Sequence, residues 1–425
     1  MALNREEYFD DRETLNIEAR EAYQKKQLLE TLEQAFRRSS AARNILDFVG
    51  MSPSDVTSAE DLSSLPIIRK TDLIEMQKTK PPFGGLLMVP ISEVERIFIS
   101  PGPIYEYQPS SLPWFARSFF AAGFRKGDIV VNTFTYHMSP AGLLFHEGLR
   151  QCGATVVVMG TGNTDSLIRA MLDLKINGFL GTPTFLASVI KKIEETGYNF
   201  RQDFALKKTW FTGEPLTAEL RQMFESRYGL ATSQAYAVTE PGGAIAYECS
   251  QKTGLHLMDD YIVEIVDPMS GKPLPPGQVG EIVVTPLHNR TWGLLRFGTG
   301  DMSSLITAPC PCGRTSYRIS GIIGRTGDAV KVRGMFVVAK QAEKVVQGYD
   351  NITIFQYRVT RREERDEITL LVETRDEFAD RPKLSAEIQQ KFQDICRVKL
   401  DYIEYVPSGT IPAQHKIIED RRQWS

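Results

Sequence analysis

The chain has 425 residues, a length that corresponds to two or three domains at ~150 residues each. With 42% hydrophobic and 24% charged residues it has an ordinary globular composition, which excludes a disordered or fibrous chain. The 50 Lys and Arg against 53 Asp and Glu give a net charge of −3, which disfavours a dedicated nucleic-acid binder.

The cysteine content and the apolar runs indicate the compartment. Five cysteines, an odd number in a long chain, are not typical of a disulfide framework. No apolar run approaches the ~20 residues of a membrane span, and residues 1–11 lack the apolar core of a signal peptide. We therefore expect a soluble, cytoplasmic enzyme with no membrane and no nucleic-acid partner.

The first sixty residues are highly charged, and apolar residues recur at helical spacing from Ile17 to Ile45, which predicts a helical lead-in over 1–75. From about residue 94, short apolar runs alternate with helical stretches, a pattern typical of βαβ units and a parallel sheet. The predicted strands are Ile97–Ile99, Ile129–Val131, Thr155–Met159, Gly178–Leu180 and Thr209–Phe211. The predicted helices are Trp114–Ala122, Ala141–Cys152, Asp165–Leu174, Pro183–Thr196 and Ala218–Tyr228.

After Tyr247 the helical signal fades, and β-type alternation predicts a β-rich part over about 247–323. From about 328 an α+β pattern follows. Its predicted elements are the strands Ala329–Val332 and Glu367–Glu373 and the helices Lys340–Gln347 and Lys383–Val398. We place the boundary at Gly324–Asp328, giving an N-terminal domain over 1–326 and a small C-terminal domain over 327–425.

Three groups of polar residues lie in or beside glycine-containing turns. Gly213-Glu214-Pro215 follows an apolar strand, at the edge where open α/β sheets bind ligands, although this tripeptide is also an ordinary loop. The run Tyr236-Ala237-Val238-Thr239-Glu240 offers a ring for a base, a hydroxyl for a phosphate and a carboxylate for Mg²⁺. Asp301 ends a Gly-Thr-Gly-Asp turn, where a carboxylate suits ribose hydroxyls, and Arg325 lies in a later turn.

The order of these motifs resembles the phenylacetate–CoA ligase family of adenylate-forming enzymes over nearly the whole chain. Further matching segments are Ser63–Leu73, Gly123–Asp128, Gly160–Thr164 and Gly181–Thr184. The resemblance implies a large α/β N-terminal domain, with parallel βαβ sheets and a β-rich subdomain, and a small mobile α+β C-terminal lid.

The same resemblance implies roles for the motif residues. Tyr236 would stack near adenine, Thr239 would bind phosphate and Glu240 would hold Mg²⁺ during catalysis. Asp301 would bind the ribose with Arg325 beside it. The remaining nucleotide-binding positions implied are Gly213, Glu214, Pro215 and Ala237.

Cysteine and histidine spacing predicts a metal site. Cys249 and His256 precede a Cys310-Pro311-Cys312-Gly313 turn, and three thiolates with one imidazole complete a closed tetrahedral zinc set. Because no position remains for water, the predicted zinc is structural. The resembled family carries a similar set. Cys152 and Cys396 are expected to be buried small hydrophobes.

Two residues are candidates for the acyl pocket. Tyr136 and Met138 lie where the resembled family places an aromatic acid. Ordinary helix packing explains them equally well.

Two segments differ from the family pattern, and a third, near the C-terminus, can be aligned with it in more than one way. Where the family has a phosphate loop ending in lysine, Ser100–Glu106 has two prolines and an acid, which predicts weak binding of β- and γ-phosphates. Gly327 replaces a hinge aspartate, and glycine still permits domain rotation. Lys416 is the candidate for the family's catalytic lysine, which acts in one of two poses of the C-terminal domain.

These features predict an AMP-forming ligase that activates an aromatic carboxylic acid with ATP and Mg²⁺ and transfers it to coenzyme A. Two alternatives remain at this stage. One is a family member that adenylates without using CoA, and the other is a nucleotide- or acyl-binding protein that has lost ATP turnover. A homodimer is a further option, and the sequence does not identify the acid.

Overall fold

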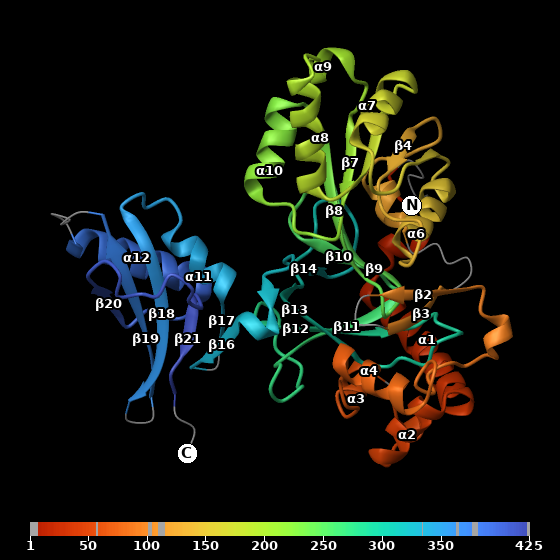
Figure 1. Ribbon diagram of the computed structural model, residues 1–425. Helices are drawn as coiled ribbons and strands as arrows, with labels where there is room; N and C mark the ends of the chain where they lie inside the picture. Colours follow the sequence, from red (N-terminus) through yellow and green to blue (C-terminus); the bar gives the residue numbers. More distant parts are fainter. Residues whose placement is uncertain are drawn as a thin grey trace.

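The computed structural model describes residues 7–56, 58–100, 104–108, 115–333, 335–362, 365–375 and 381–422. In this part of the chain the largest sheet has 13 strands, and a separate sheet of four strands lies near the C-terminus. Figure 1 shows the smaller sheet and its helices standing beside the larger body. None of the helices in the described ranges is both long and apolar enough to cross a membrane.

The N-terminal helices pack on the β-rich part of the large sheet. Ser39 separates the first two helices, because its side chain caps the second helix and donates to the Gly85 carbonyl (2.9 Å). Leu28, Leu32 and Leu46 are fully buried in one cluster with Leu287. The elements are η1 (Asp11–Thr14), α1 (Ile17–Arg38), α2 (Ser40–Phe48), η2 (Pro53–Asp55), α3 (Ala59–Leu62), β1 (Ile68–Arg69), α4 (Lys70–Thr79) and η3 (Ile91–Glu93).

The middle of the chain forms the predicted parallel sheet. Five strands pair in the order β8-β7-β6-β4-β5, every neighbour parallel, and helices connect them. The strands are β4 (Ile129–Asn132), β5 (Thr155–Val158), β6 (Gly178–Gly181), β7 (Lys208–Phe211) and β8 (Ala231–Val238). The helices are α5 (Ala116–Ala121), α6 (Ala141–Gln151), α7 (Thr164–Asp173), α8 (Pro183–Glu195), α9 (Phe200–Asp203) and α10 (Ala218–Gln222). The α/β class is thereby confirmed.

Strand β8 joins this parallel region to an antiparallel one, because its second neighbour β9 runs the opposite way. The antiparallel strands are β9 (Gly243–Glu248), β10 (Leu255–Leu257), β11 (Tyr261–Val266), β12 (Val279–Pro286), β13 (Phe297–Ile306), β14 (Arg318–Ile319) and β15 (Gly324–Arg325). Strand β1 adds to β13 in parallel, so the helical lead-in is tied to this sheet.

One local prediction was wrong, and one predicted helix changes type along its length. The strand at Ile97–Ile99 does not join the parallel sheet, because β2 (Arg96–Ser100) and β3 (Ile104–Gln108) form their own antiparallel hairpin. Strands separated by only three residues leave no room for a crossover helix. The expected helix Ala218–Tyr228 ends as α10 at Gln222 and continues as a π-helical turn over Met223–Arg227.

The hairpin also corrects the predicted phosphate loop. Residues 101–103 lie outside the described residues, and Ile104 to Glu106 belong to strand β3. Glu106 is 4% exposed and pairs with Phe98 in the register of the hairpin, so it is not a loop carboxylate facing solvent.

The C-terminal part is an α+β unit around a second core. Its four-stranded sheet has the order β20-β19-β18-β21, and Tyr357 and Leu370 of this sheet are buried in one cluster with Phe392 of α12. The elements are β16 (Ala329–Val332), β17 (Met335–Val338), α11 (Ala339–Val346), β18 (Ile352–Arg362), β19 (Arg365–Thr374), α12 (Arg381–Cys396), β20 (Tyr402–Tyr405) and β21 (Ile418–Asp420). Strand pairing changes between β15, which pairs with β13, and β16, which pairs with β17. We propose the domain boundary at 326/327 on this basis.

Candidate active site and metal centre

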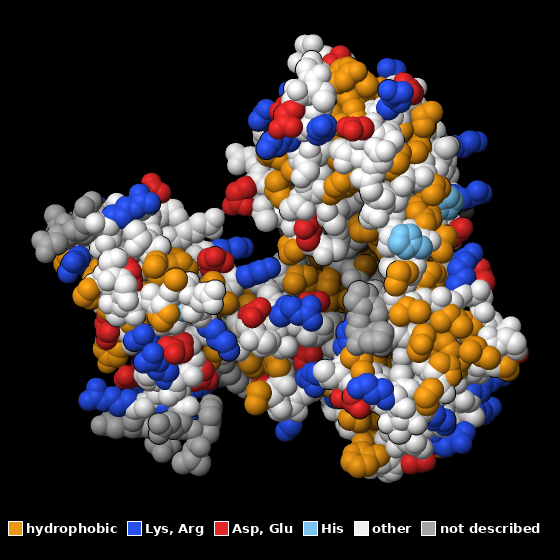
Figure 2. All heavy atoms as spheres, viewed as in Figure 1, with side chains coloured by type: hydrophobic (Ala, Val, Ile, Leu, Met, Phe, Trp, Pro, Cys, Tyr) orange, Lys and Arg blue, Asp and Glu red, His pale blue; other side chains and the backbone are white. Residues whose placement is uncertain are grey.

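A cleft of about 1150 Å³ lies between the large sheet and the C-terminal unit. It opens at the carboxyl ends of β7 and β8, the edge where open α/β sheets bind ligands. Figure 2 shows the hollow between the two parts of the molecule, with charged side chains at its base. Seven predicted nucleotide-binding residues line it: Gly213, Glu214, Pro215, Tyr236, Ala237, Asp301 and Arg325.

A short chain of polar contacts lies at the base of this cleft. The Tyr236 hydroxyl donates to Asp301 Oδ2 (2.8 Å), and Arg325 Nη1 lies 3.1 Å from Asp301 Oδ1. Burial raises the pKa of Asp301, while the hydrogen bond from Tyr236 and the charge of Arg325 act in the opposite direction. Burial and the neighbouring carboxylate together raise the pKa of Tyr236 well above its usual range, so the phenol remains a donor.

Backbone geometry aims Asp301 into the cleft. Asp301 pairs with Arg325 in the register of β13 and β15, which places both side chains at one end of the cleft. The Thr299 hydroxyl donates to the Ile282 carbonyl (2.9 Å) and accepts from the Asp301 amide (3.1 Å). Gly300 has φ +73°, a conformation that L side chains rarely adopt, so the turn requires a glycine there.

The Gly213–Pro215 turn follows β7 directly. Gly213 has φ +86°, which a turn at the end of a strand can adopt readily only with glycine. Glu214 Oε1 accepts from the Thr184 amide (2.7 Å) and hydroxyl (2.5 Å), so this carboxylate holds the first turn of α8. Glu214 therefore fixes the shape of the cleft where the Gly213–Pro215 turn meets α8.

Thr239 and Glu240 form the turn after β8 and do not line the cleft. Thr239 is exposed, and Glu240 Oε1 lies 3.1 Å from Lys70 Nζ at the start of α4. The Asp301 carboxyl is sensitive to the Glu240 charge, which raises its pKa. Lys70 was not singled out from the sequence, because a lysine at a helix start in a charged segment carries no signal of its partner.

The two acyl-pocket candidates lie in the loop after β4, outside the cleft lining. Tyr136 is half-buried, accepts from Asn132 Nδ2 (2.9 Å) and contacts the His146 ring edge-on. Met138 is 63% exposed with φ +60°, and its carbonyl accepts from the Ile99 amide (3.0 Å). The structure therefore places Tyr136, and not Met138, among packed side chains.

Lys416 is exposed in the turn before β21 and does not line the cleft. Its backbone carbonyl accepts from Gln356 Nε2 (3.2 Å), which fixes the turn to β18. Two further arginines are paired with carboxylates: Arg96 contacts Glu95 (2.9 Å) and Arg333 contacts Asp401 (3.1 Å).

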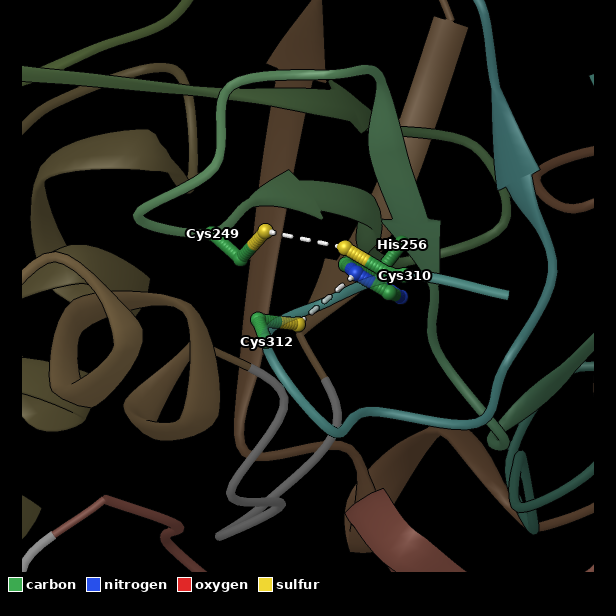
Figure 3. Close-up of side chains that lie close together, drawn as sticks. All are labelled: Cys249, His256, Cys310 and Cys312. Carbon is green, nitrogen blue, oxygen red and sulfur yellow. Dashed lines mark hydrogen bonds between the residues drawn. The ribbon is translucent and has the colours of Figure 1, made fainter. Parts of the chain in front are cut away.

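The four predicted zinc ligands converge from distant parts of the chain. The donor atoms of Cys249, His256, Cys310 and Cys312 all lie within 4.8 Å of one another (Figure 3). Cys249 and Cys310 sulfurs are 3.7 Å apart, and Cys312 Sγ lies 3.4 Å from His256 Nε2. Tetrahedral Zn²⁺ with bonds of ~2.3 Å to sulfur and ~2.05 Å to nitrogen gives S···S and S···N separations of ~3.8 and ~3.6 Å. The donor set fits the ion.

The surroundings of the cluster also suit a metal. His256 Nδ1 lies 3.1 Å from the Ser316 carbonyl, a contact that orients Nε2 toward the sulfurs. The hydrogen bond from the Cys249 thiol lowers the pKa of Cys312. Cys249, His256 and Cys310 are buried and Cys312 is partly exposed, so most of the site is shielded from bulk water.

The loop that follows the cysteines grips the N-terminal segment. Tyr8 donates to the Cys312 carbonyl (2.9 Å), and buried Arg314 binds Glu13 Oε2 (2.5 Å). The Thr315 amide donates to the Glu13 carbonyl (3.0 Å). Residues some three hundred positions apart are thus joined beside the metal ligands.

Comparison with known proteins identifies the family. Residues 114–287 match the AMP-binding enzyme family, and residues 334–422 match the AMP-binding enzyme C-terminal domain. A phenylacetate–coenzyme A ligase of Thermus thermophilus is 32% identical over 87% of this chain and 85% of its own.

Solved structures share the fold. An open conformation of 2-hydroxyisobutyryl-CoA ligase, in complex with 2-HIB-AMP and CoA, gives a TM-score of 0.87 at 24% identity, covering 96% of this chain and 93% of that one. The postadenylation state of the same ligase, covering 96% and 91%, gives 0.73 at 24% identity. The chain belongs to the phenylacetate–coenzyme A ligase family of AMP-binding enzymes and is an AMP-forming acid–CoA ligase.

Proposed function

We propose that this acid–CoA ligase activates an aromatic carboxylic acid of the phenylacetate type. A carboxylate oxygen of the acid attacks the α-phosphorus of ATP, forming the acyl adenylate and releasing pyrophosphate. The CoA thiol, after losing its proton, then attacks the acyl carbonyl carbon and displaces AMP. Since no covalent bond to the protein is needed, the side chains act by positioning and by neutralising charge.

The observation that carries the nucleotide site is the Tyr236–Asp301–Arg325 contact chain at the base of the cleft. A partly buried carboxylate with one oxygen near an exposed guanidinium is suited to accept from both hydroxyls of a ribose. Tyr236 adds a ring beside it, on which the base stacks. Gly213, Glu214, Pro215 and Ala237 form the remaining wall of this nucleotide site.

The aromatic preference rests on the surroundings of the cleft and on the relatives. Phe134 Cε1 would lie 3.8 Å from a Cβ added at Gly213, so the aromatic loop after β4 borders the cleft. Phe134 packs edge-on against Phe145 (4.7 Å between centroids), and Tyr136 lies in the same loop. Curated relatives are named phenylacetate–coenzyme A ligases. We assign Tyr136 to the acyl pocket and place Met138 at its exposed margin.

Catalytic roles follow for three further residues. Thr239 binds a phosphate oxygen through its hydroxyl, and Glu240 holds Mg²⁺, whose binding has to replace or share the ion pair with Lys70. Lys416 stabilises the charge that develops on the transferred phosphate, once the C-terminal domain has turned to bring it to the cleft.

We also propose one structural Zn²⁺ per chain, bound by Cys249, His256, Cys310 and Cys312. The separations of the donor atoms support this assignment. The ion would hold the loop that binds Glu13, and it takes no part in the reaction.

The test is pyrophosphate release with matched acids. Phenylacetate should exceed cyclohexylacetate, which has the same ring size without the aromatic faces, and both should exceed acetate. Equal rates with phenylacetate and cyclohexylacetate would contradict the aromatic preference. A thioester should form only when CoA is present. An adenylate that accumulates unchanged with CoA would favour the alternative of a ligase that does not use CoA, and no release with any acid would favour a binding protein.

A further inference from the structure

Glu281 lies directly behind the turn that carries Asp301. It belongs to β12, and its side chain is completely buried. Oε1 accepts from the Gly300 amide (3.2 Å), and Oε2 accepts from Arg69 Nη2 (2.6 Å). The carboxylate therefore connects the backbone of the residue before Asp301 to a cation on β1.

The strands are shaped around this carboxylate. The pairing of β12 with β13 shifts register between Glu281 and Val283, so β13 bulges at the Gly-Thr-Gly-Asp turn. A Cβ on Gly298 would lie 2.7 Å from Glu281 Oε1, so a side chain at this position would displace the carboxylate. In a bulge, some backbone amides lose their hydrogen-bond partner in the neighbouring strand. The Glu281 carboxylate supplies the acceptor for one of them, the Gly300 amide.

Arg69 provides the charge that makes this burial tolerable. Arg69 pairs with Gly298 in the parallel register of β1 and β13, which brings its guanidinium to the same carboxylate. A buried carboxylate without a cation costs several kcal/mol or takes up a proton. The arginine side chain remains 39% exposed, so the ion pair lies at the border between the lead-in helices and the sheet.

We propose that Glu281 is a positioning residue for nucleotide binding: through the Gly300 amide, and with Arg69 as counter-ion, it sets the place and angle of the Asp301 carboxylate. This inference rests on the ribose role proposed for Asp301. It gives the β1–α4 junction a part in the active site, because Arg69 fixes Asp301 from behind while the next residue, Lys70, contacts Glu240.

A neighbouring ion pair provides the matched control. Glu264 on β11 is also buried, and its carboxylate binds Arg296 (3.0 Å) in the same antiparallel region. This carboxylate accepts from Arg296 Nε and Nη2, which lie outside the 298–301 turn. Loss of either ion pair should lower stability, but only the loss of Glu281 should alter nucleotide affinity.

The experiment compares Glu281→Gln with Glu264→Gln. AMP affinity is measured by calorimetry, KM for ATP and for the acid together with kcat by pyrophosphate release, and Tm by calorimetric unfolding. Glu281→Gln should weaken AMP binding and raise KM for ATP by about tenfold, the effect of weakening one hydrogen bond to a charged group. KM for the acid should change less than twofold. Glu264→Gln should lower Tm and leave both nucleotide values unchanged.

Arg69→Gln keeps the inference testable if Glu281→Gln does not fold, because it changes only the partly exposed end of the pair. It should weaken AMP binding in the same direction, because the carboxylate that accepts from the Gly300 amide loses its counter-ion. Unchanged AMP affinity in a folded Glu281→Gln or Arg69→Gln protein would overturn the inference. So would an equal loss of affinity in Glu264→Gln.

Asp301→Ala separates this failure from failure of the proposed ribose site. If Asp301→Ala weakens AMP binding while the Glu281 and Arg69 variants do not, only the positioning role is wrong. If Asp301→Ala itself leaves AMP affinity unchanged, the ribose assignment is wrong and the positioning role ends with it.

Discussion

The Asp301 carboxylate is under opposing influences that set the pH range in which it accepts hydrogen bonds. Burial raises its pKa from the ordinary 3.8, so it takes up a proton at a higher pH than an exposed aspartate. A protonated carboxyl is a poorer acceptor for two ribose hydroxyls. Nucleotide affinity should therefore fall as pH decreases through this raised pKa. The stability contribution has the opposite sign, because the folded state prefers the protonated form and loses stability as pH rises through the same range.

Replacing the Asp301 carboxylate tests its proposed role in nucleotide binding. Asp301→Asn removes the charge at nearly constant volume and should weaken ATP and AMP alike by about tenfold or more, since both carry the same ribose. The loss of affinity that we expect at low pH in the parent should disappear. Calorimetric titration with AMP across a pH series measures both effects. Glu219→Gln, a change of an exposed carboxylate on the same cleft, should leave affinity unchanged; a similar loss there would indicate a general charge effect.

Single residues differed in how far the sequence could predict them. Tyr236, Asp301 and Arg325 lie in short motifs of unusual composition, and the structure brings the three together. Glu281 was not found, because in a strand of alternating residues an acid is ordinarily assigned to the solvent face. Residues 280–286 of β12 are all buried, so both faces of this strand are covered, and the alternation of residues along a single strand does not show this.

At the scale of elements, the loop over residues 310–316, which precedes β14, connects β10 to the N-terminal segment. Its Ser316 contacts His256 of β10, and its Arg314 binds Glu13. Cys310→Ser should remove the zinc and lower the Tm together, because metal binding contributes directly to folding free energy. The loss of one ligand should reduce zinc from about one per chain to well below one half. Elemental analysis and calorimetric unfolding of protein purified without chelator measure the two quantities.

Cys396→Ser is the matched control for this prediction. Cys396 is a buried thiol in α12, outside the cluster, so its replacement should lower stability and leave the zinc content unchanged. Zinc absent from the parent protein would end the metal assignment. Zinc retained in Cys310→Ser would mean that the ligand set is wrong.

Elements were predictable where burial on both faces made the pattern simple. Strand β4, covered by helices, is a continuous apolar run, and its predicted position Ile129–Val131 agrees with Ile129–Asn132. Strand β18 was missed, although Tyr357 and Val359 alternate with Gln356, Arg358 and Thr360, a pattern that favours a half-buried strand. The hairpin of β2 and β3 depends on a register between neighbours that a single strand pattern does not specify.

For the whole molecule, the position of Lys416 distinguishes the two half-reactions. In this arrangement Lys416 lies off the cleft, so its proposed role needs a turn of the C-terminal domain. Lys416→Ala should slow adenylate formation by at least about a hundredfold, since it removes charge stabilisation from the transition state. The second half-reaction, from synthetic acyl adenylate and CoA, should remain within about threefold of the parent.

Rapid quench of each half-reaction separately provides the measurement. Lys399→Ala, another exposed lysine of the same domain, is the control and should leave the first half-reaction unchanged. An equal loss in both halves for Lys416→Ala would show that this lysine supports the fold of the domain and not adenylation.

The overall class was predictable from the alternation of strands and helices, and the order of the motifs identified the family. The placement of the C-terminal domain was not, because it depends on weak contacts between two surfaces and not on any local pattern. The β16–β17 hairpin illustrates this. Val338 packs on Gly324 and Met302 of the large sheet, and the hydrophobic periodicity of the sequence does not predict this contact.

The contacts between the loop over residues 310–316 and the N-terminal segment also have a consequence for the order in which the chain folds during synthesis. Glu13 leaves the ribosome 301 positions before Arg314, its buried partner, which corresponds to roughly 15 to 60 s at ~5–20 residues per second. During that interval only partners that emerge earlier are present, such as Arg117 and Asp260, which bind Asp10 and Arg12. The ion pair of Glu13 with Arg314 is therefore among the last contacts that this segment makes.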